Sequence, residues 1–289
     1  MIAVTGANGK LGRLAIQELI KKGVSAKDIV AGVRSPEKAQ EIAALGVQVR
    51  KLDYDMPETI LSALQGVDRL LLISSSEIGK RESQHRSVIS AAKSAGVKRV
   101  VYTSILKADS SRLALAAEHL ATERFLRDSG LSFTILRNGW YLENHTENLG
   151  AALEHGVILG AAGEGRFSSA SRADYAAAAA AVVATPLSST THDGKVYELA
   201  GENAFTLSEL AAVVGRVAGK PVVYKNLSGE ELEKTLVSFG LPGPFAHILA
   251  DSDLYAAKGD LEIQSSDLAR LSGRAGQSLE SAVTAAVRR

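Results

Sequence analysis

The chain has 289 residues, 46% of them hydrophobic and 22% charged, and it contains no cysteine. This composition is typical of a soluble globular protein with a sizeable core, and it excludes disulfides, thiolate nucleophiles and Cys-ligated metal sites. The 33 Lys and Arg residues balance 32 Asp and Glu residues, so no long-range field favours nucleic acid or an anionic membrane. We find neither a signal peptide nor an apolar run of about 20 residues that would span a bilayer, and we expect a cytoplasmic protein.

Short apolar runs alternate with amphipathic stretches through the first half of the chain. The expected strands are Ile2–Thr5, Ile29–Val33, 47–52, Arg69–Ser74, Arg99–Ser104 and Phe133–Asn138. The expected helices are Gly12–Lys22, Pro36–Leu45, Pro57–Gln65, Gln84–Ala95 and Leu115–Asp128. Strands that are apolar on both faces and separated by helices are typical of a parallel sheet covered on two sides. The sequence therefore predicts an α/β fold with a Rossmann-type, doubly wound parallel sheet.

The alternation loosens after about residue 145. The glycine-rich stretch 156–169 predicts a loop or irregular strand, whereas the Ala-dominated stretch 173–185 predicts a helix that returns to the sheet. Asp174 is the expected N-terminal cap of that helix. We therefore predict a larger part over residues 1–150, which includes the returning helix, and a smaller α/β part over residues 151–289.

Two pairs of residues predict the starts of further helices in the smaller part. Thr206 is followed three positions later by Glu209, and Ser228 by Glu231. In each pair the hydroxyl and the carboxylate satisfy backbone N–H groups reciprocally, which is the capping-box arrangement. A strand is expected over residues 195–201, before the first of these helices.

Three glycines separate the first expected strand from the first helix. Gly6, Gly9 and Gly12 form a G-x-x-G-x-x-G motif at this turn. Glycine permits the sharp turn, lets a pyrophosphate approach the N–H groups at the helix N-terminus, and allows close packing of helix and strand. The alternative is a structural turn that binds nothing. The flanking strand and helix favour a dinucleotide-binding site.

The residue after the second strand indicates which dinucleotide is bound. Enzymes that use NAD commonly have Asp or Glu there, to accept hydrogen bonds from ribose hydroxyls. This chain has Arg34, followed by Ser35. A guanidinium pairs with a phosphate, so Arg34 favours NADPH over NADH unless it is a solvated surface residue. NADH remains an option as a second cofactor, and Asp53 is expected to face the adenine.

Several segments together resemble one protein family. The stretches MIAVTGANGKLG, LLLISSSE, YTSIL, LRNGWYLEN and SRADYAAAAA are similar to those of the NmrA-like group of atypical short-chain dehydrogenases. Within this group the likeness is greatest to the bacterial NAD(P)H-dependent quinone reductases, and next to the triphenylmethane reductases. The resemblance runs nearly end to end and weakens over the last 30 residues or so.

The resemblance implies a set of cofactor-binding positions. The glycine loop would hold the pyrophosphate, Arg34 the 2′-phosphate, and three serines after the fourth strand would lie along the cofactor. A stretch after the sixth strand would border the nicotinamide and the substrate. These positions are Gly6, Ala7, Asn8, Gly9, Lys10, Leu11, Gly12, Arg34, Ser74, Ser75, Ser76, Arg137, Asn138, Gly139, Trp140, Tyr141 and Leu142. Ordinary loop chemistry for the serines, and a core role for Trp140 and Tyr141, remain alternatives.

The sequence departs from typical short-chain dehydrogenases in its acid catalyst. Those enzymes use Tyr-x-x-x-Lys, but none of the seven tyrosines here has Lys four residues later. In the corresponding helix, His119 and Glu123 lie four residues apart, and we expect a surface contact between them. Nothing else in the sequence supports a metal site. Arg172 and Asp174 are expected to be structural, as an ion pair and a helix cap.

A missing acid restricts the substrates that the site can reduce. Hydride transfer to a quinone gives a phenolate-like anion whose conjugate acid has a pKa near about 10, so water can protonate it. Hydrogen bonds and a nearby cation stabilise such an anion. We expect Lys107 to be that cation, unless it is a surface residue, and Ser104 and Tyr141 to donate hydrogen bonds.

The predicted function is a reductase that moves hydride directly from NADPH to a quinone, without flavin or metal. The alternatives are an NADP(H)-sensing regulatory protein of the NmrA-like kind and a reductase of triphenylmethane or azo dyes. The missing Tyr-x-x-x-Lys disfavours a nucleotide-sugar epimerase or dehydratase. We expect a small-molecule partner only, with no nucleic acid and no membrane. The sequence leaves the oligomeric state open, with a homodimer as one option.

Overall fold

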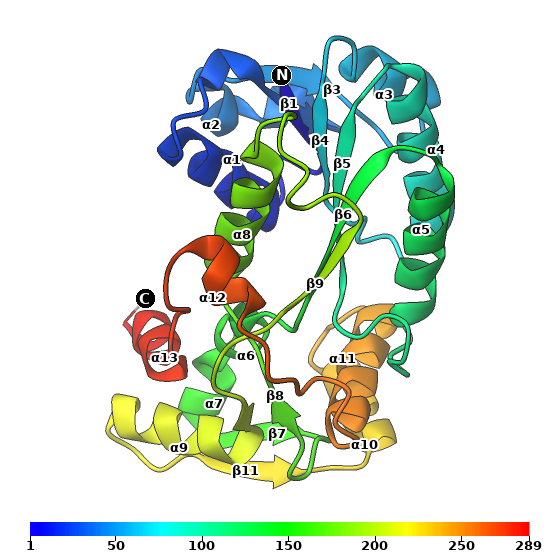
Figure 1. Cartoon of the computed structure of the whole chain (residues 1–289). Helices are drawn as coiled ribbons and strands as arrows, with labels where there is room; N and C mark the ends of the chain where they lie inside the picture. Colours follow the sequence, from blue (N-terminus) through cyan, green and yellow to red (C-terminus); the bar gives the residue numbers. More distant parts are fainter. Residues whose placement is uncertain (289) are drawn as a thin grey trace.

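The computed structural model describes residues 1–288 and is built around one parallel sheet of seven strands. The strand order is β3-β2-β1-β4-β5-β6-β9, so the direction of winding reverses between β1 and β4 (Figure 1). The strands are β1 (Ile2–Val4), β2 (Ile29–Val33), β3 (Gln48–Lys51), β4 (Arg69–Leu72), β5 (Arg99–Ile105), β6 (Ser132–Asn138) and β9 (Lys195–Leu199). The predicted doubly wound Rossmann-type fold is confirmed. Ligands of such sheets bind at the carboxyl ends of the strands beside the reversal.

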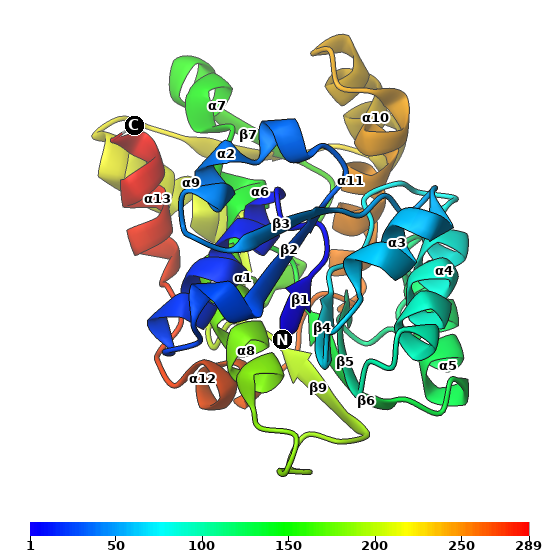
Figure 2. The ribbon, with the colours of Figure 1, turned by 90° about the horizontal axis from the view of Figure 1, so that it is seen from above.

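Alternating side chains of the strands feed two separate cores. Ile2 and Val4 of β1 belong to a core on one face, and Ala3 between them belongs to the core on the other face. Figure 2 shows the two layers of helices from above. The first face is covered by α1 (Lys10–Lys21), α2 (Gln40–Ala43), α8 (Arg172–Ala184) and α12 (Asp267–Ser272). The second is covered by α3 (Pro57–Ala63), α4 (Arg81–Ser94) and α5 (Ala116–Asp128).

Helix α8 is buried on almost every side because it packs against β4, β5 and β6 and also against the helices α1 and α12. Its alanines permit this close packing, since a helix that is apolar all round needs partners all round. The N-cap is Ser171, whose hydroxyl accepts the N–H of Asp174, so the expectation that Asp174 caps the helix is wrong. Asp174 lies in the first turn instead, where its negative carboxylate interacts favourably with the positive end of the helix dipole.

Some predicted element boundaries also differ from the structure. The helix expected over Pro36–Leu45 is a short 3₁₀ turn, η2 (Pro36–Lys38), followed by the one-turn α2. Another 3₁₀ turn, η1 (Ala26–Asp28), leads into β2. Helix α4 begins at Arg81, three residues before the expected start. Helices α1, α3 and α5 lie within two residues of their expected bounds, which is the usual uncertainty at helix ends.

The smaller part lies at the carboxyl end of the sheet, at the bottom of Figure 1. The glycine-rich stretch 156–169 contains two short strands, β7 (Val157–Gly160) and β8 (Arg166–Phe167), which pair with β11 (Val223–Asn226) and β10 (Phe205–Thr206). Both capping boxes are present, at the starts of α9 (Leu207–Ala218) and α10 (Gly229–Ser238). The other helices are α6 (Leu142–Thr146), α7 (Leu149–His155), α11 (Gly243–Ala256) and α13 (Leu279–Val287).

The two parts are interleaved along the chain. Strand β9 is the seventh strand of the main sheet, although the predicted boundary at residue 150 assigned it to the smaller part. The division at that residue as a boundary between domains stays a prediction. Among residues 1–288, no helix combines the length and the apolar character that crossing a membrane requires.

Candidate functional site

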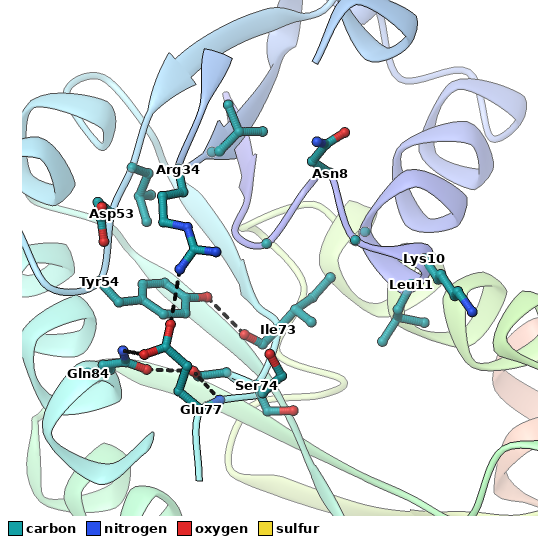
Figure 3. A pocket seen from close by; sticks show the side chains of 18 of the residues that line it. Asn8, Lys10, Leu11, Arg34, Asp53, Tyr54, Ile73, Ser74, Glu77 and Gln84 are labelled. Carbon is teal, nitrogen blue, oxygen red and sulfur yellow. Dashed lines mark hydrogen bonds and ion pairs between the residues drawn. The ribbon is translucent and has the colours of Figure 1, made fainter. Parts of the chain in front are cut away.

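A cavity of about 510 Å³ opens at the carboxyl ends of β1 to β4 (Figure 3). Its volume is in the range of small-molecule and cofactor sites. The wall consists of the loops that follow these four strands, with three further side chains from elsewhere. The lining residues are Gly6, Asn8, Gly9, Lys10, Leu11, Gly12, Gly32, Val33, Arg34, Ser35, Lys38, Leu52, Asp53, Tyr54, Ile73, Ser74, Ser75, Ser76, Glu77, Gln84, Tyr141 and Arg172.

The loop between β1 and α1 requires glycine at two positions. Gly6 has a φ of +56°, and a Cβ on Gly12 would lie 2.4 Å from the carbonyl oxygen of Gly6. Gly9 is the N-cap of α1 and has no side chain to accept the N–H groups of the first turn. These groups therefore border the cavity at the positive end of the helix dipole, which is the arrangement that binds a phosphate group.

Ala7 is the one predicted loop residue whose side chain does not line the cavity. It is fully buried in the core, and its N–H donates to the carbonyl oxygen of Gly32. Ala7 thus joins the glycine loop to β2. The other six predicted residues of this loop, from Gly6 to Gly12, line the cavity.

Arg34 lines the cavity at the end of β2 and remains 70% exposed. Its Nη1 atom lies 3.1 Å from Oε1 of Glu77, an ion pair that Figure 3 shows within the cavity. Ser35, Lys38 and Asp53 also line the cavity, and the expectation that Asp53 faces an adenine stays a prediction. The cations and hydroxyl there suit an anionic group, and a phosphate would compete with Glu77 for Arg34.

The three predicted serines after β4 all line the cavity. The N–H of Ser74 donates to the Thr103 hydroxyl, and the N–H of Ser75 donates to Nε2 of His85 over 2.9 Å. Because Nε2 accepts, Nδ1 of His85 carries the proton and donates to the Thr122 hydroxyl at 3.0 Å. Burial, reinforced by the nearby Arg81, lowers the pKa of His85 to about 3. A neutral buried imidazole therefore holds the serine loop in place.

Tyr141 follows β6, which lies on the other side of β1 and β4 from β2, so Tyr141 and its neighbour Arg172 line the cavity on the side away from Arg34. The guanidinium carbon of Arg172 is 4.8 Å from the centre of the Tyr141 ring. Its Nη1 atom lies 2.7 Å from Glu147, which also accepts the ammonium of Lys10 at 2.6 Å. Burial raises the pKa of the Tyr141 hydroxyl, against the opposing effect of Arg172, so this hydroxyl keeps its proton at neutral pH.

The other predicted residues of the 137–142 stretch do not line the cavity. Gly139 is enclosed, since a Cβ there would lie 2.9 Å from the Tyr175 hydroxyl, and Leu142 is buried. Trp140 packs against the core of the smaller part. Asn138 is buried, and its Oδ1 atom has no hydrogen-bond partner within residues 1–288.

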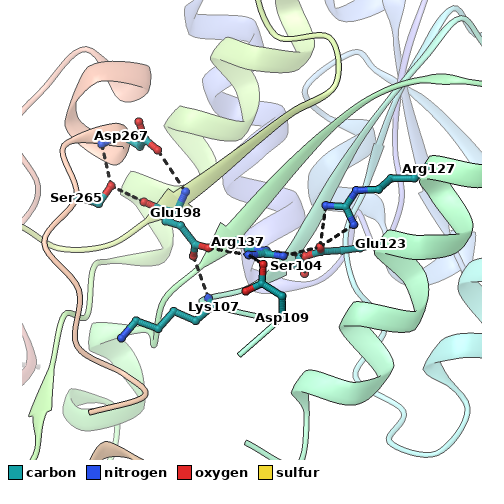
Figure 4. Close-up of polar contacts among 9 residues, drawn as sticks. All are labelled: Ser104, Lys107, Asp109, Glu123, Arg127, Arg137, Glu198, Ser265 and Asp267. Atoms are coloured by element: carbon teal, nitrogen blue, oxygen red, sulfur yellow. Dashed lines mark hydrogen bonds and ion pairs between the residues drawn. The ribbon is translucent and has the colours of Figure 1, made fainter. Parts of the chain in front are cut away.

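Arg137 and Ser104 belong to a buried polar cluster beside the cavity (Figure 4). The strand register places Ser104 of β5, Arg137 of β6 and Glu198 of β9 in one row. Glu123 of α5 is fully buried over this row and accepts both the Ser104 hydroxyl and the Arg137 guanidinium. Asp109 is a further partner of Arg137. The hydrogen-bonding groups of Ser104 and Arg137 are therefore engaged within the protein.

Lys107 is held outside the cavity. Its ammonium donates to the carbonyl oxygens of Gly259 and Glu262, at 3.0 and 2.5 Å. Its φ is +52°, and it is the one non-glycine residue with a positive φ in the part of the chain that the structure describes. The structure thus places Lys107 as a tie between β5 and the C-terminal segment, and it does not bring this side chain to Tyr141.

The expected surface contact between His119 and Glu123 is wrong. Both side chains are buried, because the face of α5 that carries them packs against the sheet. Nδ1 of His119 lies 2.7 Å from the Tyr102 hydroxyl, and burial lowers the pKa of His119 well below its usual value. Within residues 1–288 no three His, Asp or Glu side chains are placed to hold a metal ion.

Comparison with known proteins assigns the family. Residues 6–186 match a protein family described as NAD(P)H-binding. The chain is also 54% identical to Quinone oxidoreductase 2 of Escherichia coli (strain K12) over 284 residues, which cover 98% of each chain. The chain belongs to this NAD(P)H-binding family. The predicted membership of the NmrA-like group is confirmed.

Two crystal structures are closely similar to this chain. One is the NADPH-dependent quinone oxidoreductase of Escherichia coli in complex with NADPH, with a TM-score of 0.94, 53% identity and 99% of each chain covered. The other is the Citrobacter sp. triphenylmethane reductase in complex with NADP(H), with a TM-score of 0.93 and 41% identity. That match covers 99% of this chain and 100% of the reductase.

The cavity of this NAD(P)H-binding chain also contains residues that the sequence analysis did not assign to it. Lys38, Tyr54 and Gln84 line it, and so does Arg172, which was expected to be only structural. A signal for Arg172 is present in the sequence. It lies in the first turn of α8, where the helix dipole disfavours a cation, and such a residue needs a compensating partner or a function.

Proposed function

We propose that this chain is an NADPH-dependent quinone reductase that transfers hydride directly to the quinone, without flavin or metal. The main support is the near full-length similarity to a relative named Quinone oxidoreductase 2, at 54% identity. The cavity supports the cofactor independently, because it combines a loop that requires glycine at Gly6 and Gly12 with the exposed guanidinium of Arg34 after β2.

The residues that line the cavity fit NADPH. The N–H groups at the start of α1 would hold the pyrophosphate, and Arg34 with Lys38 and Ser35 would hold the 2′-phosphate. The nicotinamide would then lie toward the serine loop and Tyr141, at the other end of the cavity. When bound, NADPH supplies the hydride.

Two of the three residues expected to assist the reaction have other partners in the structure. Ser104 already donates to Glu123, and Lys107 to backbone carbonyl oxygens, so we no longer assign either residue to the reaction. Tyr141 remains as a hydrogen-bond donor at the cavity. A quinone tolerates this arrangement because its reduced anion is only as basic as a phenolate, and solvent can supply the proton. Stacking and orientation would supply most of the rate enhancement.

The test is anaerobic turnover of purified protein with NADPH and a benzoquinone, followed at the nicotinamide absorbance band. We expect stoichiometric NADPH oxidation in protein that shows no flavin absorbance, with no loss of rate in a metal chelator. NADPH binding without turnover would overturn the proposal and favour an NADP(H)-sensing protein. Failure to bind NADPH in calorimetry would overturn the cofactor assignment as well.

A dye reductase is the second candidate. The specific observation in its favour is the similarity to a triphenylmethane reductase over the full chain. Triarylmethane dyes are cations that accept hydride without a proton, so the same cavity suits them chemically. Relative kcat/KM values for a quinone and a cationic dye decide between the two. The cytoplasmic location and the homodimer stay predictions of the sequence.

A further inference from the structure

The two ends of the cavity carry different cations. Arg34 and Lys38 mark the end where the 2′-phosphate would lie, and the glycine loop occupies the middle. Arg172 lines the opposite end with Tyr141, so a hydride acceptor beside the nicotinamide would lie near its guanidinium. The expected cation Lys107 is engaged elsewhere, which leaves Arg172 as the guanidinium at the reacting end.

The guanidinium of Arg172 is fixed in position. Its side chain is 13% exposed and rests on the face of the Tyr141 ring. Nη1 pairs with Glu147 and Nη2 donates to Asn144 at 3.2 Å, while Glu143 accepts the backbone N–H of Arg172. A guanidinium held in this way keeps its charge next to the cavity at no further cost in side-chain entropy.

The neighbouring charges do not cancel that of Arg172 within the cavity. Glu147 divides its two oxygens between Arg172 and Lys10, so one carboxylate serves two cations. Glu143 lies farther from the guanidinium, at 3.9 Å. Neither carboxylate lines the cavity, whereas Arg172 and Lys10 both do. At this end of the cavity, a bound molecule therefore meets Arg172 and Lys10 at closer range than Glu143 and Glu147.

We propose that Arg172 is a specificity-determining residue, whose guanidinium favours neutral quinones over cationic acceptors. The inference rests on the proposed hydride-transfer function. A quinone is reduced by one hydride, that is two electrons and one proton, and becomes a hydroquinone monoanion that takes its second proton from solvent. A triarylmethane cation takes the same hydride and becomes neutral. The positive charge stabilises the transition state of the first reaction and repels that of the second.

The test compares kcat/KM for a neutral benzoquinone with kcat/KM for a triarylmethane cation, at saturating NADPH. The ratio cancels any loss of folded enzyme, because both values come from one preparation. Arg172→Gln should lower the quinone-to-dye ratio at least about tenfold, and Arg172→Lys should keep it within about threefold. Glu147→Gln should raise the ratio by about threefold, which gives a result of opposite sign.

Arg34→Gln is the matched control, since it removes the same charge from the far end of the cavity. Arg34→Gln should weaken NADPH binding but keep the quinone-to-dye ratio within about twofold of the wild-type value. The proposal would be overturned if Arg172→Gln lowered kcat/KM equally for the quinone and the dye. It would also be overturned if Arg34→Gln changed the quinone-to-dye ratio as much as Arg172→Gln does.

Binding without turnover supplies a second readout. In enzyme saturated with NADP⁺, Arg172→Gln should bind the dye cation at least about threefold more tightly and a phenolate anion at least about threefold more weakly. These affinities separate two kinds of failure. An inactive wild type overturns the proposed function, whereas unchanged dye and phenolate affinities in the variant overturn the role of Arg172.

Discussion

The cavity and the buried cluster lie side by side at the same edge of the sheet and use the same residue types, but they differ in how fully those residues are paired. Arg34 is 70% exposed and has one carboxylate partner, Glu77. Arg137 is 5% exposed and is paired with Glu123, Glu198 and Asp109. The first guanidinium has donors to offer to a ligand, whereas the second has already used them.

This difference separates a binding site from a structural core better than residue identity does. Buried polar groups must find partners within the fold, and a charged cluster in which every member is paired holds neighbouring elements together. The Glu123 cluster joins β5, β6, β9 and α5 in this way. The cavity instead presents loop N–H groups and an exposed Arg, which are stabilised further when an anion binds.

Breaking the buried cluster should have the largest effect. Glu123→Ala leaves Arg137 and Ser104 without their main acceptor, and we expect it to lower the free energy of unfolding by about 3–5 kcal/mol. Chemical denaturation measures this loss. NADPH affinity, measured where the variant is folded, should stay within about threefold of the wild-type value. A loss below about 1 kcal/mol, or a selective loss of NADPH binding, would contradict the structural role.

A change of charge in the cavity, by contrast, should alter nucleotide affinity. Arg34→Glu should lower NADPH affinity relative to NADH by about a hundredfold, because a charge-assisted phosphate contact is replaced by repulsion. Calorimetric titration with both nucleotides measures the ratio. Arg216→Glu is the matched control, since Arg216 is 58% exposed on α9 and outside the cavity. An unchanged ratio in Arg34→Glu would show that Arg34 does not select the cofactor.

His85, which joins the serine loop of the cavity to Thr122 of α5, predicts a dependence of stability on pH. Its pKa of about 3 in the folded protein lies below the unfolded value of about 6.5, so the unfolded chain binds the proton first as the pH falls. The neutral His85 imidazole therefore contributes its full stabilisation above about pH 6.5, and this stabilisation is lost as the pH falls toward 3. Between pH 7 and 5 it amounts to about 2 kcal/mol.

Denaturation at both pH values measures the effect. His85→Gln should reduce the fall in unfolding free energy between pH 7 and 5 by about 2 kcal/mol. His247→Gln, at a side chain that is 57% exposed on α11, should leave the fall unchanged. Equal pH dependence in wild type and His85→Gln would mean that the imidazole does not titrate as its burial requires.

The smallest effect is expected at Tyr141, within the cavity. Tyr141→Phe keeps the ring under Arg172 and removes one hydrogen-bond donor, so turnover with a quinone should fall by less than about tenfold. Steady-state kinetics with Tyr255→Phe, a change outside the cavity, provides the comparison. A loss beyond about a thousandfold, or about 4 kcal/mol, would identify Tyr141 as an obligatory acid.

The sequence predicted the cavity well where the backbone itself forms the wall. Glycine spacing, the position of Arg34 and the serines after β4 are all tied to strand ends, and strand ends share one edge of a parallel sheet. The fold followed from the same alternation of apolar runs. Helix ends were less predictable, as α2 and the Ser171 cap show, because several nearby residues compete for each cap.

The residues that were misplaced required knowledge of which way a side chain points. Ser104 and Arg137 end neighbouring strands, as predicted, but their register turns both toward α5 and Glu123. Lys107 turns toward a segment about 150 residues away in the chain, which spacing alone does not reveal. Arg172 approaches the cavity from the start of α8, so its place depends on how two distant segments pack.

Strand β9 comes late in the sequence, and this has a consequence for folding during synthesis of the chain. Strand β6 ends at residue 138, but its neighbour in the sheet is completed only at residue 199. At about 5–20 residues per second, a ribosome needs roughly 3–12 s to make the intervening 61 residues. Throughout that interval the nascent protein carries an open strand edge, with Arg137 still missing one carboxylate.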